Sequence, residues 1–248
     1  MWSFIWHTLF FDPVYNALVF FVDVVPGGDI GLAIIFTTIL VRLILLPLSL
    51  KASRTQQAMR ELEPVLKEIQ EKYKNAKEEL GKKLLEAYAK AGVNPFSSIL
   101  FLFIQIPIVI ALYLSVYKGG GIALPAINVD LLYSFIPTPE NVSMLFLGVL
   151  DIAAKSIPLA LLAGITQYFH TAFILPKQEP RKKDAAPDFK DDFARSMQLQ
   201  MRYVLPIIIV VVAYTTSAAI ALYFVVGNIL SILQELFIKR SREAAKNN

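Results

Sequence analysis

The chain has 248 residues, of which 56% are hydrophobic and 18% are charged. A soluble protein has about 25% charged residues, and a soluble domain of this size cannot bury so much apolar surface, so the composition predicts an integral membrane protein. The absence of cysteine excludes disulfides, zinc–thiolate sites and cysteine catalysis, and only two histidines are present, which argues against a histidine metal cluster. The net charge of +4 would suggest a nucleic-acid partner only if the basic residues shared one folded face, and they do not.

The basic residues are concentrated in three segments, which set the expected orientation. Of the 24 Lys and Arg residues, 10 lie in 51–93, seven in 176–202 and four in 239–248, whereas 1–29 contains none. Loops rich in Lys and Arg stay on the cytoplasmic side of a membrane. We therefore expect these three segments inside, the segments 1–29 and 118–155 outside, and a chain with its N-terminus out and its C-terminus in.

The first expected element lies within residues 1–29. Residues 13–25 are apolar, with Asn16 and Asp23 seven residues apart, a pattern that fits an amphipathic helix in the outer membrane interface. A partial additional span is the alternative, but this run is shorter than the ~20 residues that a crossing needs. The segment also has no basic n-region, so it does not have the features of a signal or transit peptide.

Longer apolar stretches follow, and they predict the membrane spans. Residues 203–238 would be about 54 Å long as one helix, too long for a ~30 Å hydrocarbon core. Both flanks of this stretch are basic, so we expect two short helices with a turn near 214–218. The predicted fold is an all-α polytopic membrane protein with five transmembrane helices, at 30–50, 96–117, 157–175, 203–216 and 217–238.

The charged segment 51–93 has its own helical pattern. It combines 10 basic and seven acidic residues with a helical repeat of apolar residues, interrupted at Lys74-Asn75-Ala76. This predicts an antiparallel hairpin of two amphipathic helices in the cytoplasm. Two interpretations of the hairpin remain open: a solvated spacer, or a mobile docking arm for a nascent chain or a targeting partner.

Arg42 is the most informative residue in the predicted spans. It lies ~12 Å from the cytoplasmic end of its helix, where an arginine costs from ~3 kcal/mol upward unless it meets water or a partner. No Asp or Glu lies in the middle of a span to pair with it. One interpretation is that Arg42 snorkels to the inner headgroups; the other is a wet cavity, with Thr38 on the same helix face.

The other spans add uncharged polar residues: Gln105, Gln167, His170, Tyr223 and Asn228. Each alone is explained by an interhelical hydrogen bond of about 1 kcal/mol, and His170 by ordinary packing. Together with Arg42 they suggest a hydrophilic groove in the inner leaflet. Walker A, G-x-S-x-G and H-E-x-x-H motifs are absent, so we expect no enzyme activity and no cofactor, although spacing alone does not exclude a serine–histidine dyad at His170.

Several short motifs occur in order along the chain: Thr38-Ile39-Leu40-Val41-Arg42-Leu43-Ile44-Leu45-Leu46-Pro47-Leu48, Val93-Asn94-Pro95, Ile104-Gln105-Ile106-Pro107, Met197-Gln198 with Pro206, and Leu222-Tyr223-Phe224-Val225-Val226-Gly227-Asn228. In this order, over roughly 30–240, they resemble the YidC/Oxa family of membrane protein insertases. The chain departs from that family where Phe96-Ser97-Ser98 replaces Gly and Pro residues, and where Thr216-Ser217-Ala218 replaces Pro-x-Gly before the last span. A large extracytoplasmic domain and a lipobox cysteine, found in some members, are absent.

The resemblance implies a multi-pass insertase and chaperone of the bacterial plasma membrane that works without nucleotide hydrolysis. It implies that Arg42 faces a groove open to cytoplasm and lipid, and that Thr38 and Phe224 contact the passing substrate helix. Gln105, Gln167, Tyr223 and Asn228 are further candidates for the groove lining, inferred from their location.

The implied partners are nascent membrane proteins and the phospholipid bilayer, with the ribosome, the signal recognition particle pathway and the Sec translocon as candidates. No nucleic-acid binding is expected beyond ribosome contact. Two rival functions are a small-solute transporter or channel and a scaffold for membrane helices. We find no inverted repeat to support the transporter, and the unpaired Arg42 disfavours the scaffold.

Overall fold

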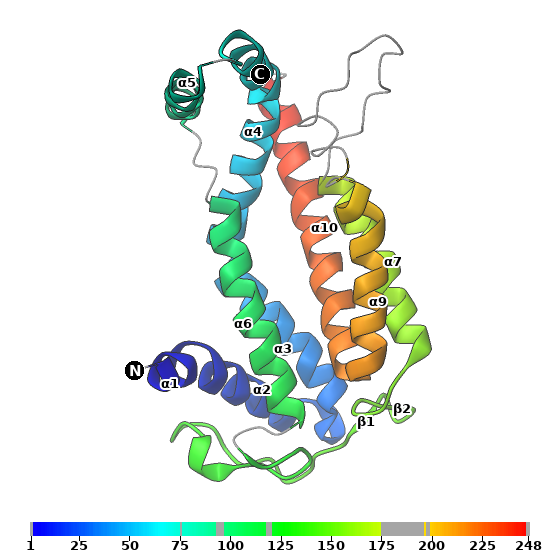
Figure 1. Ribbon diagram of the computed structural model, residues 1–248. Helices are drawn as coiled ribbons and strands as arrows, with labels where there is room; N and C mark the ends of the chain where they lie inside the picture. The colour runs from blue at the N-terminus through cyan, green and yellow to red at the C-terminus, as the bar shows by residue number, and fades with distance from the viewer. Residues whose placement is uncertain are drawn as a thin grey trace. The chain divides into compact units, whose positions relative to one another are not determined.

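The computed structural model describes residues 2–74, 76–92, 97–117, 121–174, 196 and 199–246. Its α-helices are α1 (Trp2–Trp6), α2 (Asp12–Val24), α3 (Ile30–Ile44), α4 (Leu46–Lys72), α5 (Lys77–Lys90), α6 (Ser97–Tyr117), α7 (Ile157–Ile174), α9 (Leu205–Thr216) and α10 (Ala218–Lys246) (Figure 1). The shorter elements are η1 (His7–Phe11), η2 (Pro26–Gly28), η4 (Val129–Leu131), η5 (Gln200–Val204), β1 (Leu145–Phe146) and β2 (Leu150–Asp151).

The chain divides into two compact units, which we describe one at a time. The larger unit consists of Met1–Leu43 and Ile108–Asn248, and the smaller unit is Ile44–Pro107. The larger unit contains the antiparallel pair β1–β2, each strand two residues long, so an otherwise helical fold has one small departure from the predicted all-α class.

Three helices of the described part are long and apolar enough to cross a membrane: Ser3–Val24, Ile157–Ile174 and Ala218–Ser241. The broken pair α3–α4 adds a fourth if it is counted as one span, and Phe103–Tyr117 and Gln200–Thr216 are shorter apolar helices. The protein is thus mostly helical with three to four candidate spans, and the five-span arrangement stays a prediction.

The N-terminal helical run is longer than the expected 13–25. It begins in α1 and passes through the π-helical turn η1 into α2. Pro13 has no N–H and its ring crowds the preceding turn of a helix. The backbone N–H of Asp12 bonds to the carbonyl of His7, five residues earlier, and this wider turn accommodates the proline. In Figure 1 the run lies crosswise to α7, α9 and α10 of the same unit.

Helices α7, α9 and α10 pack around small side chains. The buried cluster between them consists of Ala160, Ala163, Ala213, Ala221 and Val225. A Cβ added to Gly164 of α7 would lie only 2.2 Å from Cγ2 of Val210 on α9. Small residues let membrane helices approach closely, which replaces the hydrophobic driving force that lipid does not supply.

The last apolar stretch turns at Ser217, inside the predicted turn region. Ser217 is extended, with φ −168° and ψ 165°, between α9 and α10. The first two N–H groups of α10 donate to the backbone carbonyls of Ala154 and Ile152, at 2.8 and 3.0 Å. These bonds satisfy donors that have no partner within the helix, so the turn forms here without the Pro-x-Gly sequence. Helix α10 continues to Lys246, well beyond the predicted end at Ile238.

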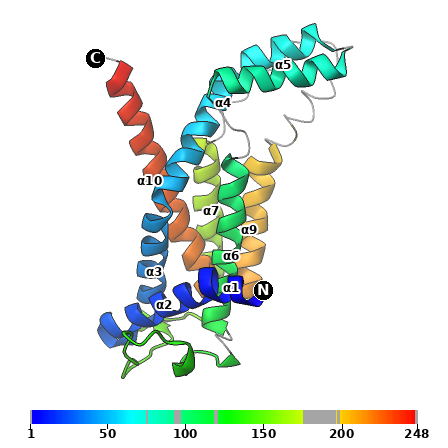
Figure 2. The same ribbon diagram turned by 90° about the vertical axis from the view of Figure 1, so that its left-hand side faces the viewer.

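The smaller unit contains the charged helices α4 and α5, which pack against each other (Figure 2). Helix α4 ends with Tyr73 as its C-cap and α5 begins at Lys77, so the break falls at the predicted interruption. Leu66 and Ala87 are buried in the seam. On the exposed side, Lys83 Nζ and Glu86 Oε2 form an ion pair of 2.8 Å.

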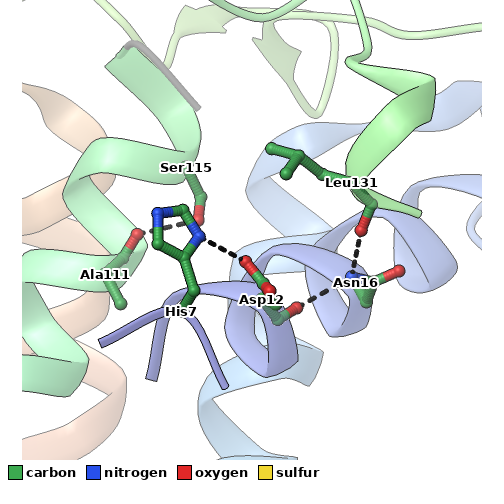
Figure 3. Close-up of polar contacts among 6 residues, drawn as sticks. All are labelled: His7, Asp12, Asn16, Ala111, Ser115 and Leu131. Atoms are coloured by element: carbon green, nitrogen blue, oxygen red, sulfur yellow. Dashed lines mark hydrogen bonds and ion pairs between the residues drawn. The ribbon is translucent and has the colours of Figure 1, made fainter. Parts of the chain in front are cut away.

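The loop between α6 and α7 is held to α2 by Asn16 (Figure 3). The Asn16 Nδ2 donates to the carbonyls of Asp12 and Leu131, both at 2.9 Å. Its Oδ1 accepts from the backbone N–H of Tyr133 at 2.7 Å. Asn16 is therefore buried against the loop, whereas Asp23, seven residues later on the same helix, is exposed.

The same loop is held to the start of α3 by Asp29. One carboxylate oxygen accepts from the N–H of Leu32, at 3.0 Å, and so caps α3. The other accepts from the N–H of Leu147, at 2.7 Å, where the backbone has a positive φ of 53°. Asn16 and Asp29 with these backbone partners are called the loop network below.

Candidate functional site

Arg42 lies in the last turn of α3, and its side chain packs against α10. A Cβ added to Gly227 would lie 3.0 Å from Nη2 and 3.7 Å from Nε of Arg42. The Nε is buried and has no hydrogen-bond partner among the described residues. Neither ion pair found in that part of the chain involves Arg42. The arginine therefore keeps unused hydrogen-bonding capacity between two apolar helices.

Two further side chains of the larger unit interact electrostatically with the guanidinium of Arg42: His170 of α7 and Tyr223 of α10. Like the Arg42 Nε, the Nδ1 of His170 is buried and has no partner in the described part of the chain. We call Arg42, His170, Tyr223 and Gly227 the arginine cluster, which brings together three helices.

Two of the predicted lining residues use their polar groups locally. Thr38 is buried, and its hydroxyl donates to the carbonyl of Ile34 at 2.7 Å, within α3. Gln167 is also buried, and its Nε2 donates to the hydroxyl of Thr171 at 3.2 Å, within α7. Each makes a hydrogen bond on its own helix, whereas the buried Nε of Arg42 has no partner in the described part of the chain.

The predicted residues on α10 pack toward α7. Asn228 Nδ2 donates to Thr166 Oγ1 at 3.2 Å and to the Ala163 carbonyl at 3.4 Å, which ties the two helices together. Phe224 packs against the small-residue cluster of α7, α9 and α10. Its ring also meets Tyr223 edge-on, with centroids 5.7 Å apart.

Gln105 belongs to the smaller unit and is described there by itself. It lies half-buried in α6, two residues before Pro107. The structure therefore brings Arg42, Thr38, Gln167, Tyr223, Phe224 and Asn228 into the larger unit and leaves Gln105 in the other.

Two members of the arginine cluster are not among the lining residues predicted from the sequence. Gly227 stands there only as part of a motif, and His170 is explained by packing when taken alone and by a hydrophilic groove when taken together with Arg42. A glycine inside a long apolar helix does carry a signal, because it marks a close approach by another group. The sequence does not say that the approaching group is an arginine from α3.

The chemistry available at the cluster is that of an anion receptor. A guanidinium offers five N–H donors in a planar fork that matches a carboxylate. Among the described residues, no group of three His, Asp or Glu is placed to hold a metal ion. The cluster can therefore attract and hydrogen-bond a negatively charged group.

Comparison with known proteins identifies a family over most of the chain. The family described as 60Kd inner membrane protein matches residues 20–246. The membrane protein insertase YidC of Oceanobacillus iheyensis is 32% identical over 247 residues, covering 98% of this chain and 86% of the relative. The YidC of Clostridium tetani is 31% identical, covering 90% and 87%, and that of Clostridium perfringens is 30% identical, covering 95% and 93%.

Proposed function

The chain belongs to the YidC/Oxa1 family of membrane protein insertases, and from this premise we propose that Arg42 receives the polar part of a nascent membrane protein during insertion. The protein is a non-enzymatic insertase of a bacterial membrane, and its substrates are nascent membrane proteins. An insertase function argues against the two alternatives that the sequence left open, a small-solute transporter or channel and a scaffold for membrane helices.

The single observation that carries the role of Arg42 is its buried Nε without a partner in the described part of the chain. A buried donor without a partner costs about 1–3 kcal/mol, and more when it is charged. Stability alone would favour an apolar side chain at this position. The unused Nε donor is therefore best explained by a ligand that binds and is released.

The proposed site is a hydrophilic groove open to the cytoplasm and to lipid. Thr38, Gln105, Gln167, Tyr223, Phe224 and Asn228 are its proposed lining. Within it, the guanidinium attracts acidic residues in a short polar tail and shortens the dry distance that the tail must cross.

Insertion then needs no nucleotide. The helical hairpin 51–93 first captures the hydrophobic segment. Transfer of that segment into lipid contributes roughly −0.3 to −0.6 kcal/mol for each central Leu, Ile, Phe or Val. The membrane potential favours outward movement of an acidic tail by ~2.3 kcal/mol per charge per 100 mV.

The short helix α9 supports local thinning of the bilayer. Together with η5, which leads directly into it, α9 forms the apolar helix Gln200–Thr216, which extends about 25 Å, against a hydrocarbon core of ~30 Å. A short span is accommodated by a thinner bilayer, which would lower the barrier for a polar tail further. We propose the five-span arrangement, with the N-terminus outside and the C-terminus in the cytoplasm, as the topology of this site.

Insertion of two reporter proteins into vesicles containing the purified protein tests the proposal. The reporters are single-span proteins that differ only in the translocated tail, acidic in one and with Asp and Glu changed to Asn and Gln in the other. Arg42→Ala should lower insertion of the acidic reporter about tenfold or more, the value of a charge-assisted hydrogen bond, and affect the neutral reporter less. Arg42→Lys should retain most of the function.

Lys155→Ala is the matched control, because it removes the same charge from an exposed loop position. It should leave both reporters unaffected. If the Arg42→Ala protein inserted both reporters as well as the wild type does, the proposal would be refuted.

Photocrosslinking tests the groove lining separately. Probes at Thr38, Gln105 and Phe224 should crosslink to a stalled nascent chain, whereas a probe at the exposed Ile44 should not. Equal crosslinking from Ile44 would argue against a defined groove.

A further inference from the structure

Gly227 differs from the other glycines in the described helices by what lies against it. The three heavy atoms nearest to an added Cβ are Nη2, Nε and Cζ of Arg42, at 3.0, 3.7 and 3.8 Å. Gly164 instead faces Val210, Gly31 faces the ring of Phe146, and Gly81 faces open space. Among these four glycines, only Gly227 has a charged side chain in the space that a Cβ would occupy.

The carbonyl of Gly227 does not account for the contact. The hydroxyl of Ser231 donates to that carbonyl at 2.9 Å, in addition to the N–H that a helical carbonyl normally accepts. The guanidinium thus rests on the bare Cα side of α10, and its buried Nε has no hydrogen-bond acceptor among the described residues. The contact is therefore a close van der Waals fit, which is possible because Gly227 has no Cβ.

We propose that Gly227 is a positioning residue for Arg42: the missing side chain provides a seat on α10 that fixes where the guanidinium donors point. This inference rests on the proposed role of Arg42 in receiving an acidic tail. A methyl group at position 227 would meet Nη2 at 3.0 Å, so the guanidinium must move by a few tenths of an ångström. A leucine would displace it from the seat.

A positioning role and a packing role predict opposite effects on stability. Alanine has a higher helix propensity than glycine, and the atoms that Gly227→Ala would meet are the far end of a flexible side chain. The thermal midpoint should therefore stay unchanged or rise while insertion of the acidic reporter falls. Gly164→Ala, which would press on Val210, should lower the midpoint and affect both reporters alike.

A double-mutant cycle with the two reporters tests the seat. Gly227→Ala should lower insertion of the acidic reporter roughly threefold and Gly227→Leu to the level of Arg42→Ala, within the range of coupling between residues in contact. In the Arg42→Ala background, Gly227→Ala should cause no further loss. Equal losses in both backgrounds, or an unchanged acidic reporter with Gly227→Leu, would overturn the proposal.

A spectroscopic measurement separates this inference from the role of Arg42 in insertion. In the protein labelled with ¹⁵N-arginine, the Nε resonance of Arg42, assigned by its loss in Arg42→Lys, should shift in Gly227→Ala and not in the control Gly81→Ala. If the resonance shifts in Gly227→Ala but the Arg42→Ala protein inserts the reporters normally, the positioning role of Gly227 stands and the proposed function of Arg42 is refuted. An unshifted resonance would refute the seat, whatever the insertion assay gives.

Discussion

The loop network and the arginine cluster both bury polar groups, but they treat them in opposite ways. Asn16 and Asp29 are buried, and their side chains make three and two hydrogen bonds to the backbone. Arg42 and His170 each have a buried nitrogen without a partner in the described part of the chain. The difference separates polar residues that hold the fold from polar residues whose unused hydrogen-bonding groups support the proposed ligand role.

The free-energy argument behind this difference is an asymmetry of hydrogen bonding. A satisfied buried hydrogen bond contributes about 0.5–1.5 kcal/mol, whereas an unsatisfied buried donor costs about 1–3 kcal/mol. Removing a side chain from the loop network leaves its backbone partners unsatisfied. Removing Arg42 instead takes away a charged side chain whose buried Nε has no partner in the described part of the chain. Substitutions in the two regions should therefore change stability in opposite directions.

The largest loss of stability is expected for Asp29→Ala. The change removes the cap of α3 and leaves the N–H of Leu147 without its acceptor. Because both bonds are to a charged group, the free energy of unfolding should fall by about 3 kcal/mol, measured by thermal unfolding in detergent. The control is Asp130→Ala, at an exposed position in η4, which should leave the midpoint unchanged. An Asp29→Ala protein as stable as the wild type would break the comparison.

A smaller loss is expected for Asn16→Ala, which leaves the Leu131 carbonyl and the Tyr133 N–H unpaired. These partners are neutral, so the free energy of unfolding should fall by about 2 kcal/mol. Asp23→Ala, at an exposed position two turns later on the same helix, should have no measurable effect. Similar midpoints for the two variants would show that Asn16 does not hold the loop.

The opposite sign is expected for Arg42→Leu. Arg42 is half-buried, and its buried Nε has no partner among the described residues. Replacing it by an apolar side chain of similar volume should raise the free energy of unfolding by about 1 kcal/mol. Thermal unfolding measured beside the insertion assay should show a more stable protein that inserts the acidic reporter poorly. A destabilised Arg42→Leu protein would assign Arg42 to the fold and remove the contrast between the regions.

The sequence predicts some of these features because their signals are local. An arginine in an apolar run, and a 36-residue apolar stretch with basic flanks, are visible without tertiary information, and the structure has a helix break at Ser217 within the predicted region. The beginning of the N-terminal helix was missed, since Pro13 is typical of a helix start and the π turn before it has no sequence signature. The contacts of Asn16 with the loop and of Gly227 with Arg42 join segments far apart in the chain, and helix periodicity carries no information on them.

The smallest effect is expected for Lys83→Ala in the hairpin, where both partners of the ion pair are exposed to solvent that can replace them. The hydrogen bond from Lys83 lowers the pKa of Glu86, and the same bond raises the pKa of Lys83. A lowered carboxylate pKa stabilises the folded state above the ordinary value of 4.5, and this contribution is lost as the pH falls through the folded pKa. A raised lysine pKa stabilises the folded state below pH 10.5, and its contribution is lost as the pH rises through the folded pKa.

The difference in thermal midpoint between the wild type and Lys83→Ala should thus be barely detectable at neutral pH and vanish in acid. A difference as large as that for Asn16→Ala would show that exposure does not separate weak from strong polar contacts in this protein.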